Sequence, residues 1–394
     1  MSSVLFFSLP AHGHVNPTLP VVRELVRRGH DVRYCMAEAF REKVEDTGAQ
    51  LVPLDAFMPP APPDLQKRAG VDFASLIEMA VDTALAMDEW MRREFEERRP
   101  DIVVADSVCA WGKLFAWKYG LPWVCSTTSL AFNEHSARYM KQSPGEVVHM
   151  MLGLPRMNAA TRRLREAGFP IKSFVQLVEN RSDVDTIVYT TRAFQPMADT
   201  FGDRFAFVGP SVKALPELRT DRVRPLVYVS LGTVLSDGAF FRRCVQALSE
   251  LDCDAVLSVG EQTDIASLGE LPGNVRAYPR VDQLHVLAGA DAFITHCGMN
   301  SASEALLLGV PMVLFPRHSE EGAVARRVQE LGAGVPLRRG TVKDIREAVR
   351  AVLGDPSYRE HAMRIRADFL RGGGPAQAAD FIERVLRRGQ EDGR

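Results

Sequence analysis

The stretch Phe293-Ile-Thr-His-Cys-Gly-Met-Asn-Ser-Ala-Ser-Glu304 decides the fold of the second half of this chain. Its apolar start predicts a buried strand that breaks at Gly298, and the residues that follow are typical of a helix. A strand, a tight turn and a helix N-terminus present backbone N–H groups at the positive end of the helix dipole, where a phosphate can bind. The same pattern also fits an ordinary strand-turn-helix unit with a capping Asn or Ser.

The spacing within this stretch indicates a nucleotide. Asn300 and Ser301 precede Glu304 by four and three residues, so on a helix all three share one face. A diphosphate at the turn would leave Glu304 facing the ribose, whose two hydroxyls can donate to a carboxylate. His296, at the end of the strand, can donate to a phosphate oxygen.

Residues 296–304, with Glu320-Glu321 after the next strand, resemble the donor-binding signature of GT-B-fold, nucleotide-sugar-dependent glycosyltransferases. The subgroup that they resemble most is the bacterial macrolide and natural-product glycosyltransferases, within the UDP-glycosyltransferase family. This resemblance implies an α/β protein with two Rossmann-like, doubly wound domains that face a central cleft. The similarity extends through four further motifs, Pro10-Ala-His-Gly-His-Val-Asn-Pro17, Ala193-Phe-Gln-Pro196, Ser230-Leu-Gly-Thr233 and Gly372-Gly-Gly374.

The composition fits a soluble two-domain enzyme that acts on small molecules. The chain has 394 residues, of which 46% are hydrophobic and 25% charged. Its 48 basic and 50 acidic residues give a formal net charge of −2, which does not favour nucleic acid or an anionic membrane as a partner. We therefore expect a nucleotide sugar and a small hydrophobic acceptor as partners, and the oligomeric state stays open.

The cysteines and the N-terminus indicate a cytoplasmic protein. The six cysteines are scattered and include no Cys-x-x-Cys pair, so we expect reduced, buried thiols. Residues 1–11 are apolar but lack a basic region and a cleavage site, which predicts a first core strand rather than a signal peptide. No apolar run approaches the ~20 residues of a membrane span.

Alternating strand and helix patterns predict two mostly parallel sheets. The expected strands of the first sheet cover residues 4–8, 31–36, 101–105, 123–126 and 186–189, and those of the second cover residues 226–230, 255–258, 275–278, 292–295 and 311–315. We expect an acceptor-binding domain over residues 1–210, a linker over 211–225 and a nucleotide-sugar domain over 226–375. By family resemblance, a helix over 376–394 packs back on the first domain.

Two irregular stretches interrupt the first domain, at residues 58–63 and 133–172. The second stretch is rich in methionine. Such residues can belong to plain core helices, or they can form a pliant apolar lining for a bulky acceptor. The methionines concerned are Met140, Met150, Met151 and Met157.

His14 and Asp106 are the predicted catalytic pair. His14 follows the first strand, and an imidazole can take a proton from a hydroxyl near neutral pH. Asp106 ends another strand of the same sheet, where a carboxylate could orient that ring. The resemblance places the base in Gly13-His-Val-Asn-Pro17, which favours His14 over His12, the second choice. The other histidines outside the donor signature, His30, His135, His149, His285, His318 and His361, receive no role.

The remaining donor-site assignments follow from the resemblance. Ser230, Gly232 and Thr233 correspond to a phosphate-contacting loop, and Arg280, Val281 and Gln283 to the segment that holds the nucleobase. Asp282 replaces the usual Pro of this segment, which leaves the choice between UDP and dTDP open. The full predicted donor set also contains His296, Gly298, Asn300, Ser301, Glu304, Glu320 and Glu321.

Glu321 departs from the pattern of glucose-using relatives, which have Gln after the acidic residue. A carboxylate there removes a donor and adds negative charge, which would suit an amino sugar. The alternative is a solvent-facing Glu that tolerates glucose. No metal is expected, because Asp252-Cys-Asp254 precedes a strand far from the predicted turns, and no cofactor is expected beyond the nucleotide sugar as co-substrate.

These features predict an inverting, metal-independent transfer of a hexose from a UDP- or dTDP-sugar to a hydroxyl of a hydrophobic natural product. Macrolide, polyketide, flavonoid and other phenolic acceptors are all compatible with the sequence. One alternative is a sugar-nucleotide epimerase or hydrolase of the same fold, and another is a non-catalytic, sugar-nucleotide-binding helper protein. A dehydrogenase is disfavoured, because neither first turn of the two domains carries Gly-x-Gly-x-x-Gly.

Overall fold

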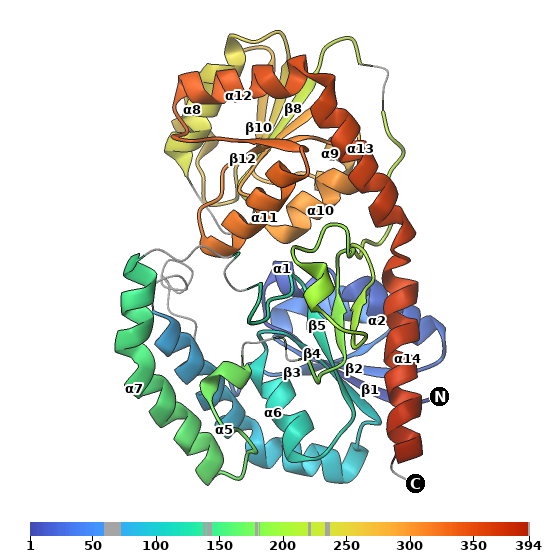
Figure 1. Cartoon of the computed structure of the whole chain (residues 1–394). Coiled ribbons are helices and arrows are strands. Elements are labelled where there is room, and N and C mark those ends of the chain that lie inside the picture. The colour runs from blue at the N-terminus through green and yellow to red at the C-terminus, as the bar shows by residue number, and fades with distance from the viewer. Residues whose placement is uncertain are drawn as a thin grey trace. The chain divides into compact units, whose positions relative to one another are not determined.

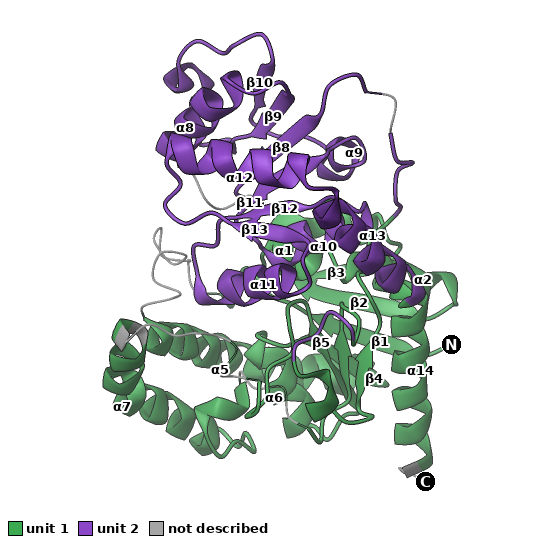
Figure 2. Cartoon of the chain, turned by 45° about the horizontal axis from the view of Figure 1, so that its top comes forward, with its two compact units in different colours: residues 1–192, 197–213, 372–394 green, residues 193–196, 214–371 purple. Residues whose placement is uncertain are grey.

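The computed structural model describes residues 1–58, 72–136, 139, 144–177, 180, 182–219, 222–232 and 237–392. The chain divides into two compact units (Figure 2). Unit 1 contains Met1–Arg192, Met197–Lys213 and Gly372–Arg394, and unit 2 contains Ala193–Pro196 and Ala214–Arg371. The border between Lys213 and Ala214 falls inside the stretch that the sequence indicated as a linker.

Unit 1 contains a seven-stranded parallel sheet with the strand order β3-β2-β1-β4-β5-β6-β7. The order reverses between β1 and β4, and the carboxyl ends of strands at such a point are where ligands bind in α/β proteins. The strands are β1 (Ser3–Phe7), β2 (Asp31–Met36), β3 (Gln50–Pro53), β4 (Ile102–Asp106), β5 (Trp123–Thr127), β6 (Thr186–Val188) and β7 (Phe205–Phe207).

Helices cover both faces of this sheet because its strands are apolar on both sides. In β1, Leu5 and Phe7 pack with one group of helices, while Val4 and Phe6 pack with the other. The first group is α5 (Phe73–Arg98), α6 (Ala110–Lys118) and α7 (Pro144–Glu166), and the second is α2 (Leu19–Arg27) and α14 (Gly374–Asp392) (Figure 1). The short α1 (His12–Val15) and α3 (Arg41–Glu45) and the 3-10 helices η1 (Glu38–Phe40), η3 (Phe174–Leu177) and η4 (Ala198–Thr200) complete the unit.

The C-terminal helix α14 belongs to unit 1 and packs against α2 and β5. Arg28 at the end of α2 forms ion pairs with Asp380 at 2.6 Å and Glu383 at 3.2 Å. A Cβ on Gly372 would lie 2.8 Å from the Cα of Gly209, so the two backbone segments approach too closely there for any other residue.

Unit 2 contains a six-stranded parallel sheet with the strand order β10-β9-β8-β11-β12-β13, which reverses between β8 and β11. Its strands are β8 (Leu226–Ser230), β9 (Asp254–Ser258), β10 (Val275–Tyr278), β11 (Ala292–Thr295), β12 (Met312–Leu314) and β13 (Gly334–Pro336). Its helices are α8 (Gly238–Ser249), α9 (Gln283–Leu287), α10 (Met299–Leu307), α11 (Ser319–Glu330), α12 (Val342–Gly354) and α13 (Pro356–Arg371), with η5 (Ile265–Leu268). The predicted pair of doubly wound α/β domains is confirmed.

All six cysteines are buried, and none of them forms a disulfide. Among the helices built from the described residues, none is both long enough and apolar enough to span a membrane.

Candidate functional site

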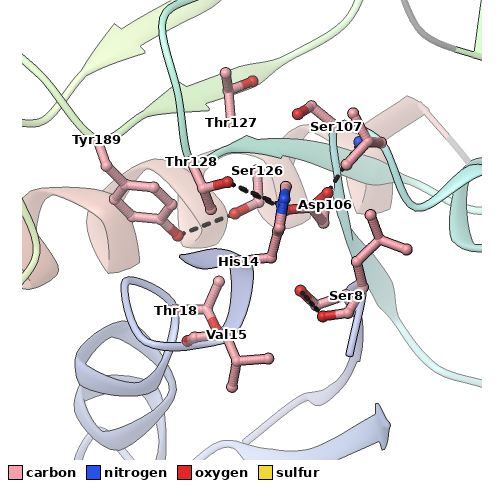
Figure 3. A network of polar contacts seen from close by, with 12 residues as sticks. Ser8, His14, Val15, Thr18, Asp106, Ser107, Ser126, Thr127, Thr128 and Tyr189 are labelled. Carbon is pink, nitrogen blue, oxygen red and sulfur yellow. Dashed lines mark hydrogen bonds and ion pairs between the residues drawn. The ribbon is translucent and has the colours of Figure 1, made fainter. Parts of the chain in front are cut away.

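The predicted pair His14 and Asp106 is in contact in unit 1. Asp106 is the last residue of β4, and His14 lies in α1, just beyond β1. Because β1 and β4 are neighbours where the strand order reverses, their carboxyl ends bring the two side chains together. His14 Nδ1 lies 2.9 Å from Asp106 Oδ2 (Figure 3), and the Asp106 side chain is fully buried while that of His14 is 29% exposed.

The contacts of Asp106 define the tautomer of His14. Asp106 Oδ1 accepts a hydrogen bond from the Val108 N–H at 2.9 Å, which orients the carboxylate. An ionised carboxylate can only accept hydrogen bonds, so Nδ1 of a neutral His14 carries the proton that it donates to Oδ2. The basic lone pair of this tautomer is on Nε2, which is the arrangement that a general base needs.

Thr128 is a third member of this cluster that the sequence analysis missed. Its Oγ1 lies 3.1 Å from His14 Nδ1 and 3.5 Å from Asp106 Oδ2 (Figure 3). Thr128 directly follows β5, the strand next to β4, so it reaches the same edge of the sheet. The run of hydroxyl side chains at the end of that strand, Ser126-Thr-Thr-Ser129, is the signal that could have identified it.

A buried layer of hydroxyl groups lies beside the pair. Ser126 Oγ is 3.0 Å from the Tyr189 hydroxyl, and Thr18 Oγ1 is 2.7 Å from that of Tyr34. Burial raises the pKa of both tyrosines, so each phenol stays protonated. His12, the second choice for the base, instead packs edge-on against Phe40, with its Nδ1 3.2 Å from Lys43 Nζ.

In unit 2 the predicted turn has the expected form, since only His296 and Cys297 separate the end of β11 from Gly298, the N-terminal cap of α10. The His296 ring fits between two glycines. A Cβ on Gly298 would lie 2.5 Å from His296 Nε2, and one on Gly232 would lie 2.8 Å from His296 Cε1. Gly232 also has φ +79°, a left-handed conformation that favours glycine. The missing side chains at both positions therefore make room for the imidazole.

His296 is a neutral imidazole near pH 7. Burial lowers its pKa to about 4, the nearby His318 acts in the same direction, and a hydrogen bond with the Ser230 backbone acts against them. Nδ1 is shielded from solvent and has no hydrogen-bond partner of normal geometry among the described residues. A neutral ring keeps one N–H, and when this N–H is directed at an anion in place of the Ser230 backbone, His296 gives a hydrogen bond without adding a full charge.

Gln283, Ser301 and Glu304 form a hydrogen-bonded cluster. Gln283 Nε2 donates to Glu304 Oε2 at 2.7 Å and to Ser301 Oγ at 3.2 Å. Burial raises the pKa of Glu304, the hydrogen bond from Gln283 lowers it, and the charge of Asp282 raises it. Asp282 itself caps α9 by accepting from the His285 N–H at 3.1 Å, so the residue that replaces the usual Pro has a local structural role.

The other predicted donor-side residues have different surroundings. Ser230 Oγ accepts from the Gly232 N–H at 3.2 Å. Asn300 lies on α10 with Ser301 and Glu304, Val281 is half-buried, and Arg280 and Glu320 are exposed. Thr233 lies outside the described residues.

Glu321 makes a structural contact that neither sequence-based alternative included. Its Oε2 accepts from the backbone N–H of Arg317 at 2.7 Å and of His318 at 3.3 Å, so it caps the start of α11. Burial raises its pKa. Glu321 is therefore not a simple solvent-facing carboxylate, and only Oε1 is outside these cap contacts.

Asp252 and Asp254 are in ion pairs, with Arg224 at 2.9 Å and Arg222 at 3.0 Å, and Cys253 between them is buried. This arrangement supports a structural role for Asp252-Cys-Asp254. Within the described ranges, no three His, Cys, Asp or Glu side chains are grouped to hold a metal ion.

Comparisons with known proteins identify the family of the chain. Residues 242–385 match the family model described as "Erythromycin biosynthesis protein CIII-like, C-terminal domain". The NDP-glycosyltransferase YjiC of Bacillus licheniformis is 33% identical over 97% of both chains, and the demethyllactenocin mycarosyltransferase of Streptomyces fradiae is 35% identical over 98% of this chain and 87% of that relative. The crystal structure of the calicheamicin glycosyltransferase CalG4 superposes with a TM-score of 0.80, at 33% identity over 98% of this chain and 99% of the other.

Proposed function

The chain belongs to the GT-B-fold nucleotide-sugar glycosyltransferases of the erythromycin and macrolide family, and from this membership we propose that it transfers a hexose from a UDP- or dTDP-sugar to a hydroxyl of a hydrophobic natural product, with inversion at the anomeric carbon. The observation that carries the proposal is the contact of 2.9 Å between His14 Nδ1 and Asp106 Oδ2 at the point where the strand order of unit 1 reverses.

In the proposed reaction, His14 is the general base. Nε2 takes the proton of the acceptor hydroxyl while the hydroxyl oxygen forms its bond to the anomeric carbon. The bond from that carbon to the diphosphate oxygen breaks in the same step, and its electron pair leaves with the diphosphate. A single in-line displacement of this kind inverts the configuration. Asp106 stabilises the imidazolium that forms, and Thr128 helps to hold the ring in the productive orientation.

On the donor side, the diphosphate is proposed to bind at the N-terminus of α10. The backbone N–H groups of its first turn, the positive end of its dipole, Ser301 and the neutral N–H of His296 are suited to a phosphate. Glu304 would accept from the ribose hydroxyls. Because these groups can stabilise the departing charge, the proposed mechanism needs no metal ion for that step.

The proposal of a hydrophobic natural product as acceptor rests on two observations. The names of two relatives specify transfer for demethyllactenocin and for calicheamicin. In addition, α7 carries apolar side chains exposed to solvent, with Met151 at 64% and Leu152 at 71%. Met157 of the same helix is fully buried and belongs to the core, Met150 is partly buried, and Met140 lies outside the described residues.

The test is a donor and acceptor panel read by mass spectrometry. Purified protein is incubated with UDP- and dTDP-sugars, with and without pooled macrolide and phenolic acceptors. We expect an acceptor-dependent gain of one hexose mass, and we expect His14→Ala to lower turnover by about 10²- to 10⁴-fold. His12→Ala is the matched control and should keep the activity.

The alternatives give different products in the same panel. Donor breakdown or isomerisation without any acceptor product would favour the hydrolase or epimerase. Donor binding with no turnover of any kind would favour the helper protein. Loss of activity in His12→Ala but not in His14→Ala would refute the choice of base.

A further inference from the structure

Tyr228 is a polar residue in the core of unit 2 that no assignment above uses. It lies in the middle of β8, is 1% exposed, and its ring stacks on Phe293 of the neighbouring β11 with centroids 4.8 Å apart and an interplanar angle of 14°. A phenylalanine could make the same stacking contact. Because a buried hydroxyl costs free energy unless it is hydrogen-bonded, the contacts of this phenol need an explanation of their own.

The phenol is hydrogen-bonded on two sides. The Tyr228 hydroxyl donates to Gln283 Oε1 at 3.3 Å. On the other side, the side chains of Ser230 and Ser258 hydrogen-bond to the phenol. Ser230 Oγ in turn accepts from the backbone N–H of Gly232. A continuous chain of hydrogen bonds therefore runs from the end of β8 through Tyr228 to Gln283.

The direction of this chain determines how the Gln283 amide is oriented. An amide oxygen only accepts and an amide nitrogen only donates, so a phenol that donates to Oε1 leaves the NH₂ group directed at Ser301 and Glu304. The opposite orientation would place Oε1 against the carboxylate of Glu304, where two acceptors repel. In that orientation the Tyr228 hydroxyl would accept from the NH₂ group instead of donating to Oε1, so the hydrogen bond between the two side chains would be reversed.

We propose that Tyr228 is a positioning residue for the nucleotide, because its hydroxyl orients the Gln283 amide, which holds the Glu304 carboxylate ready to accept hydrogen bonds from the ribose. Tyr228 does not contact the nucleotide in this proposal and acts only through Gln283 and Glu304. The inference rests on the proposed function, because it takes the ribose to lie at Glu304.

The test uses Tyr228→Phe, which removes the hydroxyl and keeps the ring that stacks on Phe293. Binding of UDP, dTDP and their 2′,3′-dideoxy analogues is measured by isothermal titration calorimetry. We expect the affinity for the better of UDP and dTDP to fall about ten-fold, the effect of one hydrogen bond. The dideoxy analogues lack the hydroxyls that Glu304 would contact, so their affinity should change less than about two-fold.

A double-mutant cycle separates this role from a structural one. If Tyr228 acts through Glu304, then Tyr228→Phe should have almost no further effect on UDP binding in a Glu304→Gln background. Tyr34→Phe is the matched control, because Tyr34 is also buried and hydrogen-bonded through its hydroxyl but lies in unit 1. It should leave nucleotide binding unchanged.

Several results would overturn the inference. One is an equal loss for nucleotides with and without ribose hydroxyls, another is full additivity with Glu304→Gln, and a third is an unchanged affinity in Tyr228→Phe. If wild-type protein binds UDP and its dideoxy analogue equally well, both the ribose contact of Glu304 and the positioning role of Tyr228 are wrong. Wild-type protein that binds none of these nucleotides would instead refute the proposed function.

Discussion

Gly298→Ala should impair both the stability of unit 2 and nucleotide binding, and the cause should be the His296 ring. Gly298 has φ −57°, so alanine is compatible with the backbone and any effect comes from the added methyl group. That methyl carbon would lie 2.5 Å from His296 Nε2 and 3.1 Å from Cε1. Ordinary contacts need about 3.5 Å, so the ring must move by roughly 1 Å.

The magnitude follows from this displacement. A methyl group added to a closely packed site costs about 1–3 kcal/mol. For a unit of this size, a loss of about 2 kcal/mol lowers Tm by about 4–8 °C. The displaced ring would also lose its proposed hydrogen bond to a phosphate. A hydrogen bond to a charged group contributes about 1.5–3 kcal/mol, which corresponds to about 10- to 150-fold in the Kd for UDP.

The assays are thermal unfolding without ligand and calorimetric titration with UDP and dTDP. Gly238→Ala is the matched control, because Gly238 is the first residue of α8 in the same unit and a Cβ there would have no atom within 4 Å. That control should keep both Tm and Kd. In ligand-free protein, His296→Ala combined with Gly298→Ala should remove most of the stability loss, because the methyl group then meets no ring.

A Gly298→Ala variant that keeps the wild-type Tm and binds UDP within two-fold would refute a clash with the His296 ring. A stability loss that persisted undiminished in the His296→Ala background would also refute this clash, since the added methyl group would then contact another group.

Four further predictions concern residues of both units. Asp106→Asn should lower kcat by about 10²- to 10⁴-fold, because the amide cannot stabilise an imidazolium, while the donor Kd measured by calorimetry should stay within two-fold. Thr128→Val should lower kcat by about five- to ten-fold. Steady-state kinetics that find kcat within two-fold of wild type would contradict the prediction for that variant. The folded protein keeps His296 neutral down to about pH 4, whereas an unfolded histidine protonates near pH ~6.5, so its contribution to stability is present above that pH and is lost as the pH falls toward 4. The loss should reach about 3 kcal/mol, as measured by denaturant titration, and should be absent in His296→Gln. Glu321→Gln keeps an oxygen for the helix cap, so stability should change by less than about 1 kcal/mol, while a donor panel should shift toward glucose; an unchanged ranking of donor sugars would reject the amino-sugar hypothesis.

Most of the fold could be predicted because the central strands are continuous apolar runs that alternate with amphipathic helices. The strands that the sequence analysis missed are β3, β7 and β13, all at or near a sheet edge. They have only three or four residues, and β13 contains Gly334 and Pro336, which are disfavoured in strands. Short edge strands are stabilised by the neighbour they pair with, and the local pattern carries little information about that neighbour.

Only those site residues that the strand order of a parallel sheet brings together could be predicted from the sequence. His14 and Asp106 each follow a strand whose carboxyl end reaches the same sheet edge, and topology brings such residues together. Thr128 and Tyr228 were not singled out because their roles depend on contacts between different segments. Tyr228 lies in an apolar strand and pairs in register with Phe293, so its sequence context is that of a core residue.

The two units use histidine in two different ways, in both cases beside the point where the strand order of the sheet reverses. His14 lies 2.9 Å from a buried carboxylate, so a proton taken up by its ring is stabilised by an opposite charge. His296 is buried between two glycines, where burial lowers its pKa to about 4 and keeps it neutral. In the proposed reaction, only His14 can therefore accept the proton of the acceptor hydroxyl. A neutral His296 has one N–H and one acceptor nitrogen, and in the proposed reaction that N–H stays on the ring, so the diphosphate would depart as an anion with no proton transferred to it.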